Sequence, residues 1–229
     1  MKNKKLFLTS TICFVAAELA LLMCILFAPH AEISCLWAII LVLLYSLLFK
    51  NKNTSVLLMQ LAFVFTLASD TFLVGVAPVI QWLAMTTFFV AQTLYFAKML
   101  LSIKAKKYVA DNIAIRIILL GCAILLGWLV LKEKLDYVAI ISLAYFASLI
   151  HNVILAFVLF KKSPMFAIGM LLFLLCDIVV GLNSAIGTYI SVPENSIWYL
   201  IAHAPFNLAW TFYLPSQTLL ALSIKDATK

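Results

Sequence analysis

The sequence contains few charged residues and no long polar stretch. Only 11% of its 229 residues are Asp, Glu, Lys or Arg, whereas 66% are hydrophobic. A soluble globular domain carries about 25% charged residues, so this composition excludes that class and is typical of a polytopic membrane protein. The apolar runs leave almost no residues for a soluble domain. We therefore expect one integral membrane domain over residues 1–229.

The usual signatures of metal and serine chemistry are also missing. The five cysteines are odd in number and lie within or beside apolar runs, which indicates neither a disulfide framework nor a zinc site. The sequence contains no HExxH and no GxSxG motif. Metal-dependent hydrolysis and serine acyl transfer therefore lack their usual motifs, and we expect no metal site.

Eight apolar runs are candidates for bilayer spans, each of which needs about 20 residues of helix. The sequence thus predicts an all-α transmembrane bundle of about eight helices. The predicted spans cover residues 6–28, 34–49, 54–76, 79–103, 113–131, 138–160, 165–190 and 197–224. The first run follows a basic segment, as in a signal peptide, but it is too long for that class and contains Glu18, so we interpret it as a span.

The net charge of +7 follows the predicted topology. The basic residues assigned to one side are Lys2, Lys4, Lys5, Lys50, Lys52, Lys104, Lys106, Lys107, Arg116, Lys161, Lys162, Lys225 and Lys229. The other side has Lys132 and Lys134, offset by Glu133 and Asp136. The positive-inside rule then predicts that both termini are cytoplasmic. We expect the basic side to face anionic lipid headgroups rather than nucleic acid, and short loops favour a bacterial inner membrane.

The two halves of the sequence share short segments. Asp70 follows "FVFTLAS" and Asp177 follows "LLFLLC", and the next spans contain "AQTLYFAKMLLSIKA" and "SQTLLALSIKDA". These matches predict parallel repeats over residues 1–107 and 108–229, with the two aspartates related by a pseudo-two-fold axis along the membrane normal. Chance similarity between apolar segments is the alternative.

Three carboxylates interrupt the apolar runs: Glu18, Asp70 and Asp177. A charged carboxylate at the bilayer centre costs about 2.5–3.5 kcal/mol even on the most lenient scale, so such residues normally face a protein interior or a wet cavity. We expect the two aspartates to be functional. Glu18 has a structural alternative, as a contact with a neighbouring helix.

Other polar residues recur at helical spacing and predict an internal cleft. They are Gln92 and Tyr95 in the fourth span, Tyr145, Ser148 and Asn152 in the sixth, and His203, Asn207, Thr211 and Gln217 in the eighth. Each has a plainer interpretation. Polar residues often join membrane helices by hydrogen bonds, and His203 can be a wet interfacial residue. We expect Lys98 to extend toward the interface, and Pro205 and Pro215 to bend the last span.

Two neighbouring buried carboxyl groups have a specific chemical capability. Their pKa values separate, so that one is protonated while the other is ionised near neutral pH. One group then donates a proton while the other stabilises positive charge or activates water.

At these residues the sequence resembles the YhhN family of integral membrane proteins, which includes the lysoplasmalogenases. The family pattern has an apolar run ending in Gly-Asp, a His-x-x-Tyr helix, a Phe-x-x-Ser-Asp and a terminal Tyr-x-x-x-Gln. The corresponding segments are "TLASDTFLV", "FVAQTLYF", "GMLLFLLCDIVVGL" and "TFYLPSQTLLALS". Gln92 stands where the family has His, and Cys176 where it has Ser. The resemblance covers most of the chain from about residue 54 onward.

The resemblance implies hydrolysis of the vinyl ether bond of lysoplasmalogen, a lysophospholipid, to a fatty aldehyde and a glycerophospho-base, with no metal or organic cofactor required. Asp70 and Asp177 are the implied acid/base pair. The candidate substrate-binding residues are Glu18, Gln92, Tyr95, His203, Asn207, Tyr213 and Gln217. The replacement of the family His by Gln92 leaves no imidazole at that position.

Two other classes are compatible with the same residues. A small proton-coupled transporter also combines parallel repeats with carboxylates near the midplane, although it often has Gly/Pro-broken helices in both halves. Pro205 and Pro215 have no counterparts in the fourth span apart from Pro78 at its start, which weakens the transporter interpretation. A structural scaffold would use the aspartates for stability alone.

Overall fold

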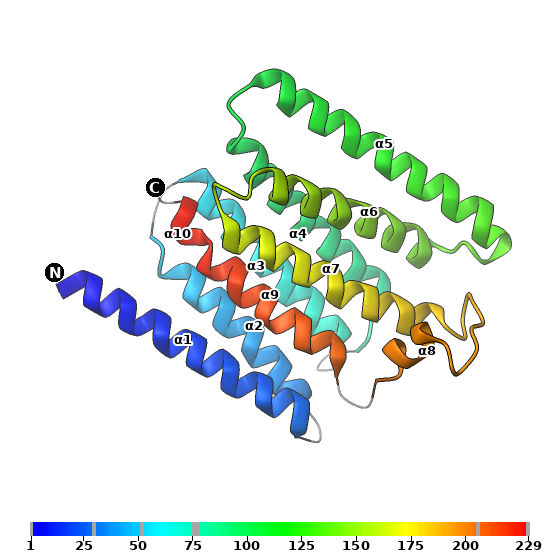
Figure 1. The fold of residues 1–229 in the computed structure, drawn as a ribbon, viewed down its shortest axis with the longest axis horizontal. Coiled ribbons are helices and arrows are strands. Elements are labelled where there is room, and N and C mark those ends of the chain that lie inside the picture. Colours follow the sequence, from blue (N-terminus) through cyan, green and yellow to red (C-terminus); the bar gives the residue numbers. More distant parts are fainter. Residues whose placement is uncertain (1, 29–30, 51–52, 75–77, 205–206, 228–229) are drawn as a thin grey trace.

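The chain folds into a bundle of long helices (Figure 1). The computed structural model describes residues 2–28, 31–50, 53–74, 78–204 and 207–227. The helices are α1 (Lys2–Phe27), α2 (Glu32–Leu47), α3 (Thr54–Leu73), α4 (Gln81–Leu101), α5 (Lys106–Leu131), η1 (Lys132–Lys134), α6 (Tyr137–Val158), α7 (Pro164–Ala185), α8 (Ile197–Ala202), α9 (Leu208–Leu222) and α10 (Ile224–Ala227). The predicted all-α membrane bundle is confirmed.

Short polar residues set the starts of several helices. Asn53 accepts a hydrogen bond from the backbone N–H of Ser55 (2.9 Å) and caps α3, and Asp136 accepts one from Ala139 (2.7 Å) and caps α6. Pro164 occupies the first turn of α7, where its missing N–H has no intrahelical acceptor to serve. These residues separate apolar runs that would otherwise extend without a defined start.

Most predicted spans agree with the observed helices, with two corrections. Six helices among the described residues are long and apolar enough to cross a membrane, whereas α2 and α9 are shorter, with 16 and 15 residues. The helix α5 begins at Lys106, seven residues before the predicted start of its span at 113. The predicted span 197–224 is not one helix, because α8 ends at Ala202 and α9 begins at Leu208.

The prolines of this last predicted span do not explain that difference within the described residues. Pro215 stands inside α9 without ending it. The expected bend at Pro205 lies outside the described residues. The consequence for the predicted polar stripe is that His203 and Thr211 do not share a helix, since His203 follows α8 and Thr211 lies in α9.

The helices pack as two central pairs with others around them. Helix α3 lies against α4 and α7 against α9, while α6 contacts both α4 and α7. Helix α1 packs on α2 and α9, and α5 lies at the opposite edge of the bundle against α6 (Figure 1). The pairs α3–α4 and α7–α9 are those that the predicted repeat would make equivalent. The repeat itself stays a prediction.

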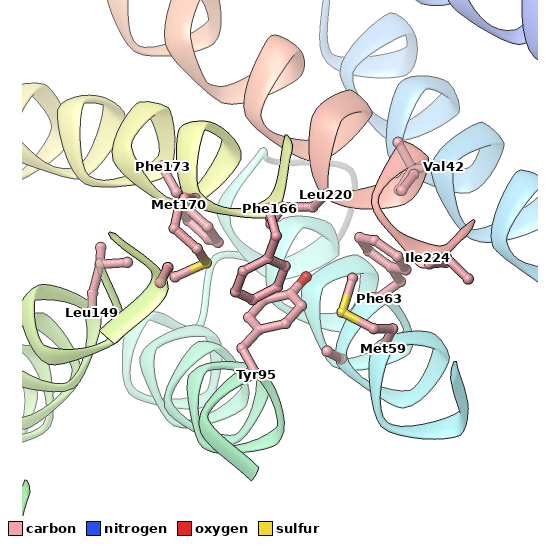
Figure 2. Packing of buried hydrophobic residues seen from close by; sticks show 14 of the residues in the cluster. Val42, Met59, Phe63, Tyr95, Leu149, Phe166, Met170, Phe173, Leu220 and Ile224 are labelled. Atoms are coloured by element: carbon pink, nitrogen blue, oxygen red, sulfur yellow. The ribbon is translucent and has the colours of Figure 1, made fainter. Parts of the chain in front are cut away.

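The interior is aromatic, and the outer surface is apolar. Figure 2 shows Tyr95 of α4 and Phe166 of α7 meeting ring to ring, at 5.9 Å between centroids, with Phe63 of α3 at 6.3 Å from Tyr95. Large apolar side chains are also exposed along the outward faces, above all on α1 and α5. Exposed apolar area on this scale is unfavourable in water and fits a lipid environment.

Both termini lie at one end of the bundle (Figure 1), as the even number of predicted spans requires. Two basic residues differ from their predicted positions. The ammonium of Lys98 does not extend to the interface but is buried, 3.7 Å from the centre of the Phe166 ring. Arg116 of α5, which the sequence analysis assigned to that end, is instead buried inside the bundle.

Gly169 occurs at a close contact between α7 and α9, and this contact generates a stability prediction. A Cβ atom at Gly169 would lie 3.0 Å from the Cγ atom and 3.2 Å from the backbone nitrogen of Leu220. The Gly169 carbonyl also accepts a hydrogen bond from the Ser216 hydroxyl (2.8 Å). Small residues allow such close approach between membrane helices. We expect Gly169→Leu to destabilise the protein by about 1–3 kcal/mol, measured by thermal unfolding in detergent.

Gly181 supplies the matched control, because it lies on the same helix and a Cβ atom there would have no neighbour within 4 Å. Gly181→Leu should leave the unfolding midpoint unchanged or slightly higher, since Gly is a poor helix former. Equal destabilisation at both positions would contradict the close approach of α7 to α9.

Candidate active site

Each of the two predicted aspartates is hydrogen-bonded to a tyrosine from another helix. Asp70, on α3, is 3% exposed, and its Oδ2 accepts a hydrogen bond from the Tyr213 hydroxyl of α9 (2.6 Å). Asp177, on α7, is half-buried, and its Oδ2 accepts a hydrogen bond from the Tyr145 hydroxyl of α6. Four helices therefore meet around two carboxyl groups. A hydroxyl donor offsets part of the cost of burying each carboxyl.

The two Asp–Tyr pairs belong to one cluster. The Phe88 ring lies between the tyrosines, 5.7 Å from the Tyr145 ring and 6.4 Å from the Tyr213 ring. Asp70 and Asp177 are close enough for a direct electrostatic interaction. Because low-dielectric surroundings screen charges weakly, the protonation state of one carboxyl depends on that of the other. The arrangement suits proton donation by one group and proton acceptance by the other.

Hydrogen bonds and small residues fix Asp70 in this position. The Ser69 hydroxyl, next to Asp70 in sequence, donates to the Ala84 carbonyl of α4 (2.7 Å) and ties α3 to α4. Tyr95 of α4 is fully buried and lies within electrostatic range of Asp70. These contacts hold α3 in register with α4, so the Asp70 carboxyl points toward α9.

Gln217 adds an unused amide to this region. It lies one helical turn after Tyr213 on α9 and is fully buried. Neither its Oε1 nor its Nε2 has a hydrogen-bond partner in the described part of the chain. A buried amide without partners is costly, and such a group is a natural place for a water molecule or a polar substrate group.

Several predicted site residues have no hydrogen bond to the aspartates in the described part of the chain. Gln92 is buried, but its Oε1 accepts a hydrogen bond from Asn152 Nδ2 (2.8 Å) instead of facing the carboxyl groups. Glu18 is buried on α1, whose principal neighbours are α2 and α9, and its oxygens have no hydrogen-bond partner among the described residues. His203 is exposed, and its ring stacks on Tyr199 at 4.0 Å between centroids.

A cavity of about 380 Å³ opens at the end of the bundle opposite the termini, between α7, α8 and the start of α9. Its polar lining residues are Asn183, Ser184 and Asn207. Val180, which also lines the cavity, follows Asp177 by three residues on α7, so the cavity lies about one helical turn beyond Asp177. Asn207 thus faces this cavity rather than the carboxyl groups themselves.

Sequence reasoning did not identify Tyr145 as the partner of Asp177. The residue was visible in the polar stripe that includes Ser148 and Asn152, but a stripe on one helix does not reveal which helix faces it. No group of three or more His, Cys, Asp or Glu side chains with metal-binding geometry occurs within the described residues. The site chemistry that the structure presents is that of carboxyl and hydroxyl groups.

Comparison with known protein families matches residues 30–224 to the YhhN family. No curated protein and no solved structure matches the chain. The family match covers most of the sequence, including every residue of the two Asp–Tyr pairs. The chain therefore belongs to the YhhN family.

Proposed function

We propose that the protein hydrolyses the vinyl ether bond of lysoplasmalogen and releases a fatty aldehyde and a glycerophospho-base. The observation that carries this proposal is the pair of interacting carboxyl groups, Asp70 and Asp177, each bonded to a tyrosine inside an apolar bundle. Membership of the YhhN family supports it. An enzyme that cleaves a lipid ether needs an acid and a base within reach of the bilayer interior, and the cluster offers both groups.

The first step is protonation of the vinyl ether. The π electrons of the double bond take a proton from a carboxylic acid at the β-carbon, and an oxocarbenium ion forms at the carbon that bears the ether oxygen. We assign this proton to Asp70, which is the more deeply buried of the two aspartates. Its hydrogen bond with Tyr213 uses Oδ2, which leaves Oδ1 to carry the proton. The second, ionised carboxylate stabilises the cation.

The second step is capture of the cation by water. The water oxygen bonds to the cationic carbon while a proton passes from the water to Asp177, and the product is a hemiacetal. Asp177 suits this role because it is half-buried and lies about one turn from the cavity at the outer end of α7. The hemiacetal then splits into aldehyde and alcohol as its hydroxyl proton moves to the glycerol oxygen. A proton returned from Asp177 to Asp70 completes the cycle without redox change.

The membrane setting fits this substrate. The alkenyl chain can lie among the helices while the glycerophospho-base remains at the interface. Each methylene removed from water contributes about 0.8 kcal/mol, so the chain supplies much of the binding free energy. Lysine-rich loops at the terminal end and short loops elsewhere support placement in a bacterial inner membrane with both termini in the cytoplasm.

The central prediction concerns the product and the two aspartates. Purified protein in detergent should release aldehyde from an alkenyl lysophospholipid and no fatty acid from the matched acyl lysophospholipid. Asp70→Asn and Asp177→Asn should each lower turnover by about 10²–10⁴-fold, because an amide neither donates the required proton nor accepts one. Aldehyde is measured by coupled reduction, and gel filtration checks that each variant is folded.

Full activity in both folded Asn variants would overturn the acid/base assignment. Fatty acid from the acyl substrate would indicate a different lipase chemistry. Substrate-driven proton flux in proteoliposomes without any product would favour a carrier over a hydrolase.

The two tyrosines generate a second, graded prediction. Tyr145→Phe and Tyr213→Phe keep the rings and remove only the hydroxyls that hold the carboxyl groups. Each should lower kcat about tenfold or less, which is a smaller loss than in the Asn variants, because a typical hydrogen bond contributes a net of about 0.5–1.5 kcal/mol. Tyr45→Phe is the control, since the Tyr45 hydroxyl bonds to Thr11 of α1 at 3.0 Å. An equal loss in all three Phe variants would indicate a general effect on packing.

A further inference from the structure

Arg116 is a buried cation that lacks an anionic partner. It lies on α5, is 6% exposed and forms no ion pair with the described residues. Its Nη1 donates to Asn152 Oδ1 of α6 (2.9 Å), and its guanidinium carbon lies 4.4 Å from the centre of the Phe96 ring of α4. An amide and an aromatic ring are neutral, so they offset only part of the cost of removing a guanidinium from water. This position favours the binding of an anion.

The guanidinium and two neighbouring side chains carry nitrogen atoms without hydrogen-bond partners among the described residues. Arg116 Nη2, Gln92 Nε2 and His151 Nδ1 have no hydrogen-bond partner in the described part of the chain. Gln92 belongs to the group because it bonds to Asn152, the same side chain that Arg116 contacts. The His151 ring lies 5.2 Å from the Phe96 ring, on which the guanidinium also stacks.

These side chains form one cluster inside the bundle. All three come from different helices, α5, α4 and α6, and each is more than nine-tenths buried. Leaving buried donors unpaired is unfavourable, so an acceptor with several oxygens would stabilise the group. A phosphate ester has that property, and guanidinium is the side chain best matched to its geometry.

The site lies at a suitable depth and distance from the aspartates. Asn152 follows Tyr145, the partner of Asp177, by seven residues on α6, which corresponds to about 10 Å along the helix. A glycerophosphate unit has six bonds from its ether carbon to its phosphorus and is shorter than this rise, so the side chains of the two sites have to cover the remaining distance. Asn152 also lies six residues before the end of α6 at Val158, or about 9 Å from the end of the bundle that carries the termini.

We infer that Arg116 and the Gln92 amide bind the phosphodiester of the lysophospholipid substrate, with His151 at the edge of the site. This inference rests on the proposed function and deepens it, because it orients the lipid. The phosphate lies toward the lysine-rich end and the vinyl ether reaches the aspartates, so the substrate enters from the leaflet at the terminal end. Water reaches Asp177 from the opposite end, where the cavity opens.

The test compares two substrates that differ only in the phosphate. Aldehyde release from an alkenyl glycerophosphoethanolamine and from the corresponding alkenyl glycerol is measured with the full-length protein at fixed detergent concentration. Arg116→Gln should raise KM for the phosphorylated substrate about 30-fold or more and leave KM for alkenyl glycerol unchanged. Arg116→Lys, which retains the charge but loses the planar donor pair, should give an intermediate KM. Equal effects on both substrates would show that Arg116 acts only on packing and would overturn the inference.

Lys98→Met is the matched control, because Lys98 is a second buried cation that stacks on an aromatic ring, on another face of α4. It should not discriminate between the two substrates. A discrimination equal to that of Arg116→Gln would indicate a general effect of buried charge and would also overturn the inference.

Binding measurements separate this inference from the proposed hydrolysis. A non-hydrolysable alkyl glycerophosphoethanolamine should raise the thermal unfolding midpoint of wild-type protein and of Asp70→Asn, but not of Arg116→Gln. That result without aldehyde release would support the phosphate site and reject the hydrolase. Aldehyde release together with binding that does not depend on Arg116 would support the hydrolase and reject the phosphate site. Stabilisation by inorganic phosphate alone, dependent on Arg116, would overturn the assignment to a lipid.

Discussion

A carboxyl group inside a lipid-surrounded bundle needs a partner, and this constraint links the fold to the candidate site. Asp70 finds a tyrosine hydroxyl on α9, and Asp177 finds one on α6. Without these donors each carboxyl would lose its hydration with little compensation. The two bonds therefore join α3 to α9 and α6 to α7, and the close contact of α7 with α9 at Gly169 links the two pairs of helices. The contacts that lower the cost of burial also arrange the reactive groups.

The two carboxyl groups are similar in sequence and different in surroundings. If the halves of the chain are repeats, α9 corresponds to α4 and α6 corresponds to α2. Tyr213 then belongs to the last helix of the second half, α9, and Tyr145 belongs to the second helix of the same half, α6. The tyrosine partners of the two aspartates are therefore not equivalent. Asp70 is closed off, whereas Asp177 lies near the outer cavity. Unequal access to water gives two identical side chains the means to perform different steps of a reaction.

Hydropathy predicts this fold well because the bilayer selects helices by length and apolarity. It also identified Asp70 and Asp177, since a polar residue in an apolar run is conspicuous, whereas Tyr213 was identified by the resemblance to the YhhN family. It failed where contacts between helices decide the outcome. Arg116 lies close to a predicted span boundary, so it resembled an interfacial charge, but α5 starts earlier and carries it into the bundle. The role of Tyr145 depends on which helix faces α6. His203 does not share a helix with the other predicted residues of the last span, because α8 and α9 are separate.

The helix α6 joins the two polar regions of the bundle and sets the distance between them. Tyr145 faces the aspartates and Asn152 holds Arg116 and Gln92, two turns further along the same rigid helix. Because a helix has a fixed rise per residue, the separation between these two residues is constant, whereas the separation between two residues on a loop would vary with the motion of the loop. A site with buried donors rejects an analogue that lacks the matching acceptor more strongly than an apolar pocket rejects a missing methylene. Under the proposed function, selectivity for a phosphorylated ether would come from two groups of polar residues placed at a fixed spacing on one helix.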